Sequence, residues 1–217
     1  MSPDKDLVIG WIAPAMCSTR FADSLTRAAL DPRLQLRLVS ITNLIAGPLI
    51  ADARCVTVDR FLTTDAQWLL MIDSDMVFTP ADILTLLEAA DATHRPIVGG
   101  LCVGTGQAHS QGIAAEAGWF VDGTIRRVSP ATTGGLAQVD FVGAGALLVH
   151  RRVYEHLATL HPRPQPWFQE VVFDGRVDGE DWTFCRRATS AGFPIYVHAD
   201  VRMGHVKSFV ITPAAKE

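Results

Sequence analysis

The first half of the chain alternates between short, continuously apolar runs and segments in which apolar residues recur at helical spacing. The apolar runs predict four strands, at residues 7–13, 34–41, 68–72 and 96–103. The segments between them predict helices at 21–30, at 48–61 and from 80 onward. Thr79 is expected to cap the third helix together with Asp82, three positions later. Strands that alternate with helices are typical of an α/β fold with a mostly parallel central sheet and helices on both faces.

The second half of the chain has more turn residues and fewer helical patterns. Residues 118–128 place an Asp-Gly pair between β-rich flanks, which predicts a hairpin. The remaining elements are expected in this order: a strand interrupted by small residues at 139–149, a helix at 151–161, a loop rich in proline and glycine at 162–179, a helix at 180–191 and a strand at 194–200. Gly192 is a suitable residue to end the last helix.

Composition and charge are those of one globular domain spanning residues 1–217. Hydrophobic residues make up 48% of the chain and charged residues 19%, so it can bury a substantial core. The formal net charge of -4 gives no overall reason to expect nucleic acid or an acidic membrane surface as a partner. No apolar run approaches the ~20 residues of a membrane span, so no span is expected.

Cysteine usage indicates the compartment. The four cysteines, Cys17, Cys55, Cys102 and Cys185, have no CxxC spacing, which argues against a zinc site and against a disulfide framework. The first apolar run lacks a basic segment before it and contains a proline, so it is not expected to be a signal peptide. These features predict a soluble, cytoplasmic protein.

Two carboxylates follow the most hydrophobic strand directly. Asp73 and Asp75, with Ser74 between them, come after the apolar run at 68–72. Ligands bind beyond the carboxyl ends of strands in an open parallel sheet, and an unpaired buried carboxylate is costly. A hard divalent cation, Mg²⁺ or Mn²⁺, would compensate both side chains and leave positions for phosphate oxygens. The alternative is that the aspartates only end the strand.

Three further segments carry candidate chemistry. Glu180 and Asp181 open a predicted helix, where the helix dipole is expected to keep a carboxylate ionised. Acidic first turns are common in ordinary helices, but Trp167 and Trp182 nearby could form an apolar wall for a sugar ring. His205 follows the last strand beside a glycine, and it is a candidate ligand only in company with the two aspartates.

The small residues Gly143, Ala144 and Gly145 interrupt a predicted strand. Glycines inside a strand mark a bulge or a close approach of backbone or ligand. Both interpretations remain open from the pattern.

Taken in order, these motifs resemble the GT-A-fold glycosyltransferases, the Rossmann-like nucleotide-diphospho-sugar transferases, and particularly the family-2-like ones. The matching features are an apolar strand ending in Asp-x-Asp, a Gly-x-Gly strand, a helix beginning "GED" and a late Gly-His. The resemblance spans nearly the whole chain. It implies a nucleotide-sugar donor, most often a UDP- or GDP-sugar, and a divalent metal, Mn²⁺ or Mg²⁺.

The resemblance also implies roles for residues near the metal. Asp75 would bind the metal, Asp73 would hold the donor ribose or the metal's waters, and His205 would complete the metal site. Ser74 would belong to the donor-binding set. Asp181 would be the catalytic base of an inverting transfer, with Glu180 beside it. Retaining members of the fold carry acidic residues near this position, so the stereochemical outcome stays open.

Other roles that the resemblance implies concern the two substrates. Arg54 would contact the nucleotide, and the loop that includes Ala13 and Pro14 would receive the base and ribose. Residues 143–145, with Trp167 and Trp182, would line the sugar and acceptor. Residues 1–103 would then form the nucleotide-binding half and residues 104–217 the acceptor and catalytic half.

Two other functions remain as alternatives. A sugar nucleotidyltransferase would share the fold, but the loop after the first strand, "APAMCSTRF", lacks the glycine-rich basic character that grips a triphosphate. A non-catalytic module that binds sugar nucleotides would not need the late histidine and the Gly-Glu-Asp helix. The acceptor is left open among a saccharide, a protein, a small molecule and a hydroxymethylated DNA base. The oligomeric state is also left open.

Overall fold

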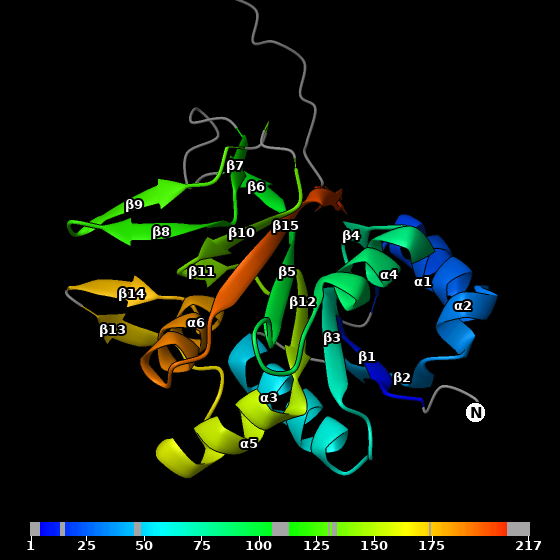
Figure 1. Cartoon of the computed structure of the whole chain (residues 1–217), viewed down its shortest axis with the longest axis horizontal. Helices are drawn as coiled ribbons and strands as arrows, with labels where there is room; N and C mark the ends of the chain where they lie inside the picture. Colours follow the sequence, from blue (N-terminus) through cyan, green and yellow to red (C-terminus); the bar gives the residue numbers. More distant parts are fainter. Residues whose placement is uncertain are drawn as a thin grey trace, which may run out of the picture.

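A central seven-stranded sheet with helices packed on its two faces organises the computed structural model of the chain (Figure 1). The structure describes residues 5–13, 16–45, 49–105, 113–129, 131, 134–173 and 175–207. The strands of the central sheet, in spatial order, are β10 (Leu136–Val139), β15 (Ile195–Arg202), β5 (Ile97–Leu101), β12 (Ala146–His150), β3 (Trp68–Asp73), β1 (Leu7–Ala13) and β2 (Leu38–Ile45).

The central sheet is mixed, which corrects the expectation of a mostly parallel one. Strand β1 pairs in parallel with β2 and β3, and β15 pairs in parallel with β5. Strand β12 is antiparallel to both of its neighbours, β3 and β5, and β10 is antiparallel to β15. No crossover helix precedes β10 or β12 in the described chain, and a parallel pairing needs such a crossover. Strands β10 and β12 therefore run in the direction opposite to the other strands of the central sheet.

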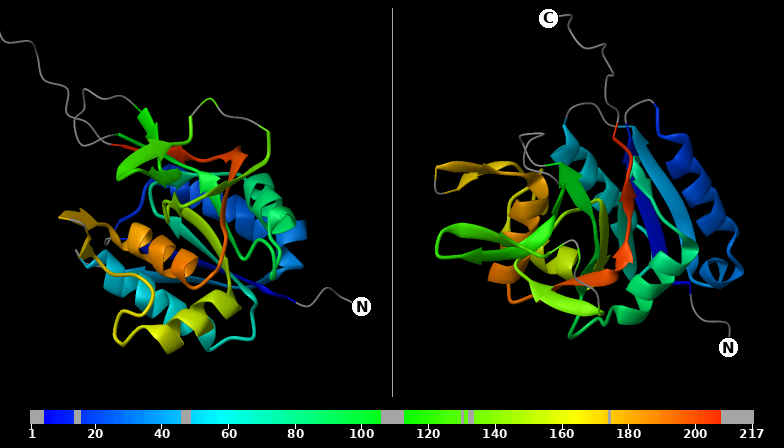
Figure 2. Two further views of the ribbon diagram at one scale, coloured as in Figure 1. Left: turned by 60° about the vertical axis from the view of Figure 1, so that its left-hand side comes forward. Right: turned by 90° about the horizontal axis from the view of Figure 1, so that it is seen from above.

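Two hydrophobic clusters lie on opposite faces of this sheet. Alternate residues of a strand point to opposite faces, and in β3 Leu69 and Met71 belong to one cluster while Leu70 and Ile72 belong to the other. The first cluster includes residues of the helices α3 (Ile50–Leu62), α5 (Arg151–Leu160) and α6 (Glu180–Ser190). The second includes residues of α1 (Thr19–Leu30), α2 (Pro32–Gln35) and α4 (Pro80–Ala89). Helices thus cover both faces, as Figure 2 shows.

Small strands flank the central sheet (Figure 1). A three-stranded sheet has the order β11 (Phe141–Val142), β8 (Ala117–Val121) and β9 (Thr124–Arg127). Three two-stranded pairs complete the set: β4 (Met76–Val77) with β16 (Gly204–His205), β6 (Val103–Thr105) with β7 (Ile113–Ala115), and β13 (Val171–Phe173) with β14 (Arg176–Asp178). The last pair lies within 162–179, where the sequence predicts only a loop.

Local sequence signals agree with the structure where they are strong. Thr79 and Asp82 form the expected capping box at the start of α4. Asp122 and Gly123 both have positive φ, 47° and 73°, as the Asp-Gly hairpin turn requires. The strand predicted at 34–41 is wrong at its start, because Asp31 caps the short helix α2 and β2 begins only at Leu38.

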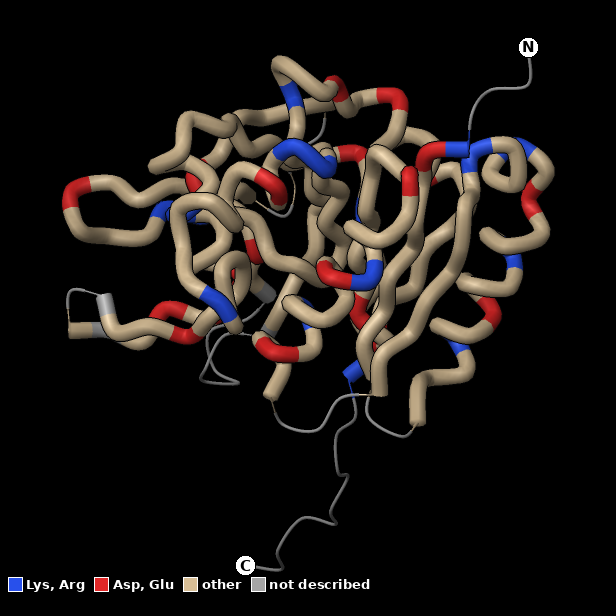
Figure 3. The backbone as a smooth tube through the Cα atoms, turned by 90° about the horizontal axis from the view of Figure 1, so that it is seen from below, with Lys and Arg blue, Asp and Glu red and all other residues tan. Residues whose placement is uncertain are grey.

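Charged residues of both signs are interspersed along the described chain (Figure 3). In the described part of the chain, no helix combines the length and apolar character needed to cross a bilayer.

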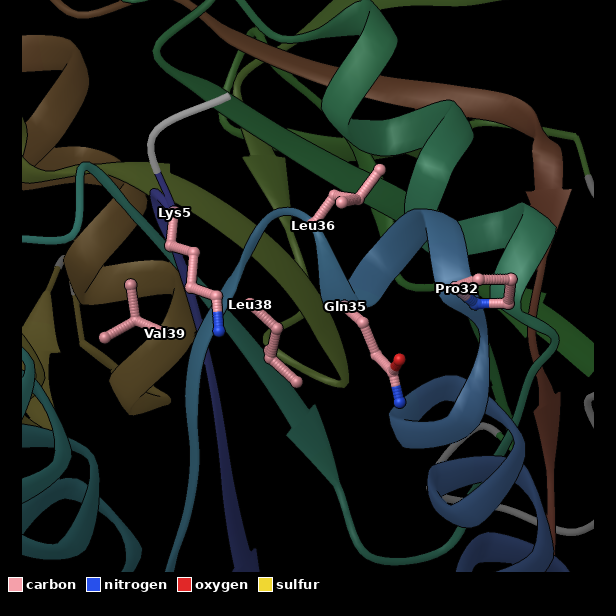
Figure 4. A pocket seen from close by; sticks show the side chains of 6 residues that line it. All are labelled: Lys5, Pro32, Gln35, Leu36, Leu38 and Val39. Atoms are coloured by element: carbon pink, nitrogen blue, oxygen red, sulfur yellow. The ribbon is translucent and has the colours of Figure 1, made fainter. Parts of the chain in front are cut away.

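One hollow of about 680 Å³ lies near the start of β1 and β2 (Figure 4). It is lined by Lys5, Pro32, Gln35, Leu36, Leu38 and Val39. Lys5 precedes β1 and Leu38 begins β2, so this hollow is at the amino ends of these parallel strands. Binding sites of such sheets lie at the carboxyl ends, and the hollow contains none of the candidate residues.

Candidate functional site

The turn after β3 brings Asp75 next to β16, the last strand in the described part of the chain. Asp73 is the last residue of β3, and residues 74–75 form a turn that leads into β4. Strand β16 pairs antiparallel with β4, so that His205 stands opposite Met76. The backbone N–H of Val206 also donates to the carbonyl of Asp75, at 2.8 Å. His205 is therefore placed beside Asp75 although 130 positions separate them in sequence.

One carboxylate oxygen of Asp75 has two nitrogen partners. Its Oδ2 lies 2.8 Å from Nε2 of His205 and 3.1 Å from Nζ of Lys207. The other ring nitrogen of His205, Nδ1, lies 2.9 Å from the carbonyl oxygen of Val103, which orients the ring. Burial alone raises the pKa of Asp75, but the hydrogen bond and charge of His205 outweigh it, so that the pKa lies below its usual value.

These residues have the donor chemistry that a divalent cation requires. Asp75 Oδ2 and His205 Nε2 lie 2.8 Å apart, and Asp73 is the last residue of β3, two positions before Asp75. Carboxylate oxygen and imidazole nitrogen suit Mn²⁺, and the ammonium group of Lys207 shows that a cation is accommodated on Asp75. Among the described residues, no three His, Cys, Asp or Glu side chains form a ready ligand group. Asp75 and His205 therefore fit a metal by type and proximity, and a third ligand would have to turn toward it.

Arg54 joins Asp73 to the acidic helix. This side chain of α3 is buried, and its Nη2 lies 2.9 Å from Oδ1 of Asp73 while its Nε lies 3.1 Å from Oε1 of Glu180. Its Nη1 also donates to the carbonyl of Ala144, at 3.5 Å. Burial alone would lower the pKa of Arg54, but the surrounding carboxylates, Asp73 first, raise it above its ordinary value.

The position of Arg54 limits what its side chain can contact. Only 3% of the residue is exposed, so its guanidinium group is committed to Asp73, Glu180 and the loop at 143–145. In this structure Arg54 contacts these carboxylates and leaves almost no surface for a nucleotide.

Asp181 lies in the first turn of α6 with an unusual pKa. Burial, followed by the charge of Glu180, raises this pKa from 3.8 to about 7. The charge of Arg54 and the backbone N–H of Trp182, which donates to Oδ1 at 2.8 Å, act in the opposite direction. The helix dipole therefore does not keep Asp181 fully ionised as expected, because desolvation wins. A carboxylate with a pKa near 7 is well suited to accept a proton at neutral pH.

The loop at 143–145 packs tightly against Glu116. A Cβ atom at Gly143 would lie 2.9 Å from Oε2 of Glu116 and 3.1 Å from its Cβ, so any other residue would force a shift there. The backbone N–H of Gly143 donates to the carbonyl of Glu116, at 2.6 Å, and the carbonyl of Gly145 accepts from the N–H of Asp73, at 3.2 Å. The glycines thus mark a close approach, and the loop lies against both Glu116 and Asp73.

The remaining predicted residues differ in their placement. Trp167 has no exposed surface, and its indole N–H donates to the carbonyl of Tyr154 in the core, so in this structure it does not line a site for an acceptor as expected. Trp182 is half-buried against Phe120 and Phe141. Ala13 ends β1 as a buried residue, and Pro14 lies outside the described residues. Ser74 lies in the turn between the aspartates, and its carbonyl accepts from the N–H of Ser18.

Sequence reasoning missed two charged residues at this site. Lys207 lies two residues after His205 in the "MGHVK" segment. The sequence prediction considered only the histidine of this segment. Glu116 lies near Asp181 and contributes to its raised pKa, but in the sequence it is a single acidic residue among small ones. No spacing signal identifies it.

The raised pKa of Asp181 predicts a dependence of stability on pH. The folded protein keeps a proton on Asp181 between pH 3.8 and about 7 that the unfolded chain has already lost. The free energy of unfolding therefore falls as pH rises through this window. Asp181→Asn cannot ionise but keeps an oxygen for the N–H of Trp182, so it should raise the free energy of unfolding by about 1–3 kcal/mol at pH 8.

Urea unfolding at pH 8 and at pH 4, in the presence of chelator, measures this effect. The two proteins should have nearly equal stability at pH 4. An Asp181→Asn variant that is less stable than the wild type at pH 8 would contradict the raised pKa of Asp181.

Comparisons with solved structures identify the fold as GT-A-like. The chain matches the viral protein A197 from STIV with a TM-score of 0.58 and 16% identity, covering 98% of this chain and 100% of that one. It also matches GalNAc-T7, a glycosyltransferase whose structure contains UDP, GalNAc and Mn²⁺, with a TM-score of 0.62 and 10% identity. That match covers 93% of this chain and 44% of the GalNAc-T7 chain, so this chain spans less than half the length of that protein.

No model of a known protein family matches the chain, and no curated protein matches it in sequence. At 10% and 16% identity the two likenesses concern the fold alone.

Proposed function

We propose that this protein is a glycosyltransferase that moves a sugar from a nucleotide-diphosphate donor to a hydroxyl group of an acceptor. The observation that carries the proposal is the buried bridge from Asp73 through Arg54 to Glu180. It ties the strand end that carries both aspartates to the helix that carries Asp181, on a GT-A-like fold. The alternatives, nucleotidyl transfer and binding without catalysis, gain no support from a specific contact.

Two groups of residues divide the chemistry. Asp75 and His205, with Asp73, would hold Mn²⁺ or Mg²⁺, which when bound would neutralise the charge that develops on the departing nucleoside diphosphate. Asp181 takes the proton of the acceptor hydroxyl as this oxygen attacks the anomeric carbon, since its pKa of about 7 allows it to be ionised at neutral pH. In this inverting form of the reaction no covalent intermediate with the protein is needed.

Glu180 and Arg54 position this base. Because Glu180 is held by Nε of Arg54, it fixes the first turn of α6 beside the acceptor side of the proposed site. The loop at 143–145 and the exposed part of Trp182 would line the sugar and the acceptor. The first half of the chain, residues 1–103, would bind the donor through Ala13, Pro14 and Ser74, and the second half, residues 104–217, would bind the acceptor.

Metal dependence is the first test of this function. Thermal unfolding is measured with a panel of UDP- and GDP-sugars, with Mn²⁺ and with chelator, since a ligand of the folded state raises its stability. We expect one nucleotide sugar to stabilise the wild type in Mn²⁺ and slow hydrolysis of this donor to stop in chelator. Asp75→Asn should lose both effects without unfolding.

Asp65→Asn is the matched control for Asp75→Asn. Asp65 is exposed and precedes β3, at the opposite end of the strand that leads to Asp75. This variant should keep the stabilisation and the hydrolysis. Full turnover of the donor in excess chelator would refute the metal dependence.

A further inference from the structure

Strand β2 forms one edge of the central sheet, and in the described part of the chain it pairs with β1 alone (Figure 1). The free edge of such a strand presents backbone N–H and C=O groups that no neighbouring strand satisfies. Nη1 of Arg60 donates to the carbonyl of Asn43, at 2.9 Å, and among the described residues no other side chain bonds to the backbone of β2. The edge is therefore open to a further strand.

Strand β2 also lacks most of the features that prevent edge strands from pairing. Natural edge strands are commonly short, charged, or interrupted by proline or a bulge. The eight residues of β2, Leu38–Ile45, include no charged residue and no proline. One shift in the register with β1 lies near the amino end, at Val39, and the six residues 40–45 pair regularly. This regular stretch is suited to accept a partner strand.

Exposed apolar side chains are concentrated around this edge. In the described chain thirteen large apolar residues are exposed, and seven of them lie between residues 30 and 56: Leu30, Leu36, Val39, Ile45, Leu49, Ile50 and Val56. The elements that carry them are neighbours, because α2 and β2 line one hollow and Arg60 of α3 bonds to β2. A concentration of exposed apolar surface of this kind marks an interaction site.

The two ends of β2 have complementary shapes. The hollow of about 680 Å³ lies at the amino end and includes Leu36 and Val39 in its lining (Figure 4). At the carboxyl end Ile45 is 71% exposed. Two strands that pair about a two-fold axis run antiparallel, so the carboxyl end of each lies beside the amino end of the other. Such a pairing brings Ile45 of each copy to the hollow of the other copy.

The distribution of charge fits a second copy of the chain. Residues near a two-fold axis face their own copies, so a charged residue there would repel its equivalent. The middle of β2, residues 40–44, carries no charge. The strand can therefore lie against itself without repulsion.

The dimensions of this face also fit a dimer. A standard interface buries ~800 Å² on each partner. Eight residues at about 3.3 Å each make β2 about 26 Å long, and the sheet with one helical layer on each face is about 30 Å thick. A contact of this length and thickness reaches the area that a stable dimer needs.

We propose that this protein forms a two-fold symmetric dimer in which the β2 strands of two copies pair antiparallel and join the two central sheets. The apolar residues of α2 and α3 beside β2 complete the interface. The candidate site at the end of β3 is separated from this edge by β1, so it lies outside the interface. The proposal goes beyond the proposed function and does not depend on it.

Sedimentation velocity of the whole chain over a range of concentrations tests the dimer. We expect a species with twice the mass of the chain to form as the concentration rises. Asn43→Lys should raise the dissociation constant at least about tenfold, because two ammonium groups then lie near the axis and repel. Ile45→Ser should raise it about tenfold by removing apolar surface from the contact with the hollow. Both residues are exposed, so both variants should keep the melting temperature of the dilute wild type.

Thr124→Lys is the matched control for Asn43→Lys. Thr124 is exposed and begins β9, an edge strand of the three-stranded sheet, so this variant adds the same charge to a different strand edge. Its dissociation constant should stay within about twofold of the wild type. An equal loss in the two variants would show that net charge and not β2 controls the association.

Hydrogen exchange locates the interface. When two β2 strands pair, their outward amides gain hydrogen-bond partners, so exchange in residues 38–45 should slow as the protein concentration rises. Exchange in β9 should not depend on concentration. This measurement separates strand pairing from association through another surface.

Three results would overturn the dimer: a monomer at every concentration up to about 100 µM, association of Asn43→Lys as tight as that of the wild type, or exchange in β2 that is independent of concentration. Slow exchange in β2 of a monomer would show that another strand covers this edge, and the dimer would fail as well. None of these measurements uses a sugar donor. Failure of the dimer therefore leaves the glycosyltransferase proposal intact, and failure of that proposal leaves the dimer intact.

Discussion

Replacing Asp181 by Asn is expected to lower the rate of sugar transfer by about 10²–10⁴-fold, the range for loss of a general base. The substitution keeps the size of the side chain and the oxygen that accepts from the N–H of Trp182. It removes only the ability to take a proton. Affinity for the donor and for Mn²⁺ should stay within a few-fold of the wild type, because Asp181 contacts neither Asp75 nor His205 in the described contacts. Single-turnover rates and donor binding, measured separately, test this.

The pH profile provides an independent readout of the same residue. With a pKa of about 7, the ionised fraction of Asp181 rises with pH and levels off above neutrality. The wild-type rate should therefore fall about tenfold for each pH unit below the pKa. In Asp181→Asn this dependence should disappear, whereas in Glu155→Gln, on the exposed part of α5, rate and profile should be unchanged.

A substitution of Glu180 distinguishes its role from that of Asp181. Glu180→Gln keeps an oxygen for Arg54 but loses the charge, so it should disturb acceptor binding and the position of α6 more than the proton transfer. If Glu180→Gln is inactive while Asp181→Asn transfers sugar at the wild-type rate, the roles are reversed. If neither change slows transfer, the inverting mechanism is wrong for this protein.

Replacing Arg54 by Met is expected to cost about 3–5 kcal/mol of unfolding free energy, because it removes one partner from a buried set of charges. Methionine fills similar space, so the loss reports the charge and its hydrogen bonds. Asp73 and Glu180 would then lie close together without the cation between them. The pKa of Asp181 should also rise further, since the charge of Arg54 lowers it. The optimum of any remaining activity should move to higher pH.

Arg33→Met is the matched control for Arg54→Met. Arg33 pairs with Asp31 at 2.8 Å, but its side chain is 63% exposed. Exposed pairs contribute little, so the control should leave the free energy of unfolding close to that of the wild type. Urea unfolding of both variants measures these changes. If Arg54→Met lowers the free energy of unfolding by less than about 1 kcal/mol, the contacts of Arg54 with Asp73 and Glu180 do not stabilise the fold.

The sequence by itself determined the features that depend on neighbouring residues. The apolar run before Asp73 predicts the buried strand β3 because five successive apolar side chains suit a strand covered on both faces. Thr79 with Asp82, and Asp122 with Gly123, fix a helix start and a hairpin turn through hydrogen bonds and backbone angles within four residues. The location of Asp75 at the carboxyl end of a strand was also predictable, since it follows from the order of the elements.

Only the tertiary structure decided which of the candidate residues meet. The direction of β12 depends on its partners β3 and β5, which are distant in sequence. Trp167 is in the core because Tyr154 and its helix cover it, although tryptophan in a loop rich in proline and glycine also fits an open binding surface. The pKa of Asp181 was expected to be low from the helix dipole, and it is high because burial and Glu180 act together.

Two long-range contacts of the site, Arg54 with Glu180 and Asp75 with His205, show why the sequence alone could not determine the pairing. Arg54 and Glu180 are 126 positions apart, and Asp75 and His205 are 130 apart. Electrostatic energy and desolvation depend on distance and on the surrounding dielectric, and neither is written in the spacing of residues along the chain. The sequence therefore determined which charges this protein carries and at which strand or helix ends. The packing of α3, α6 and β16 around β3 decided which of them pair and which carboxyl group has a raised pKa.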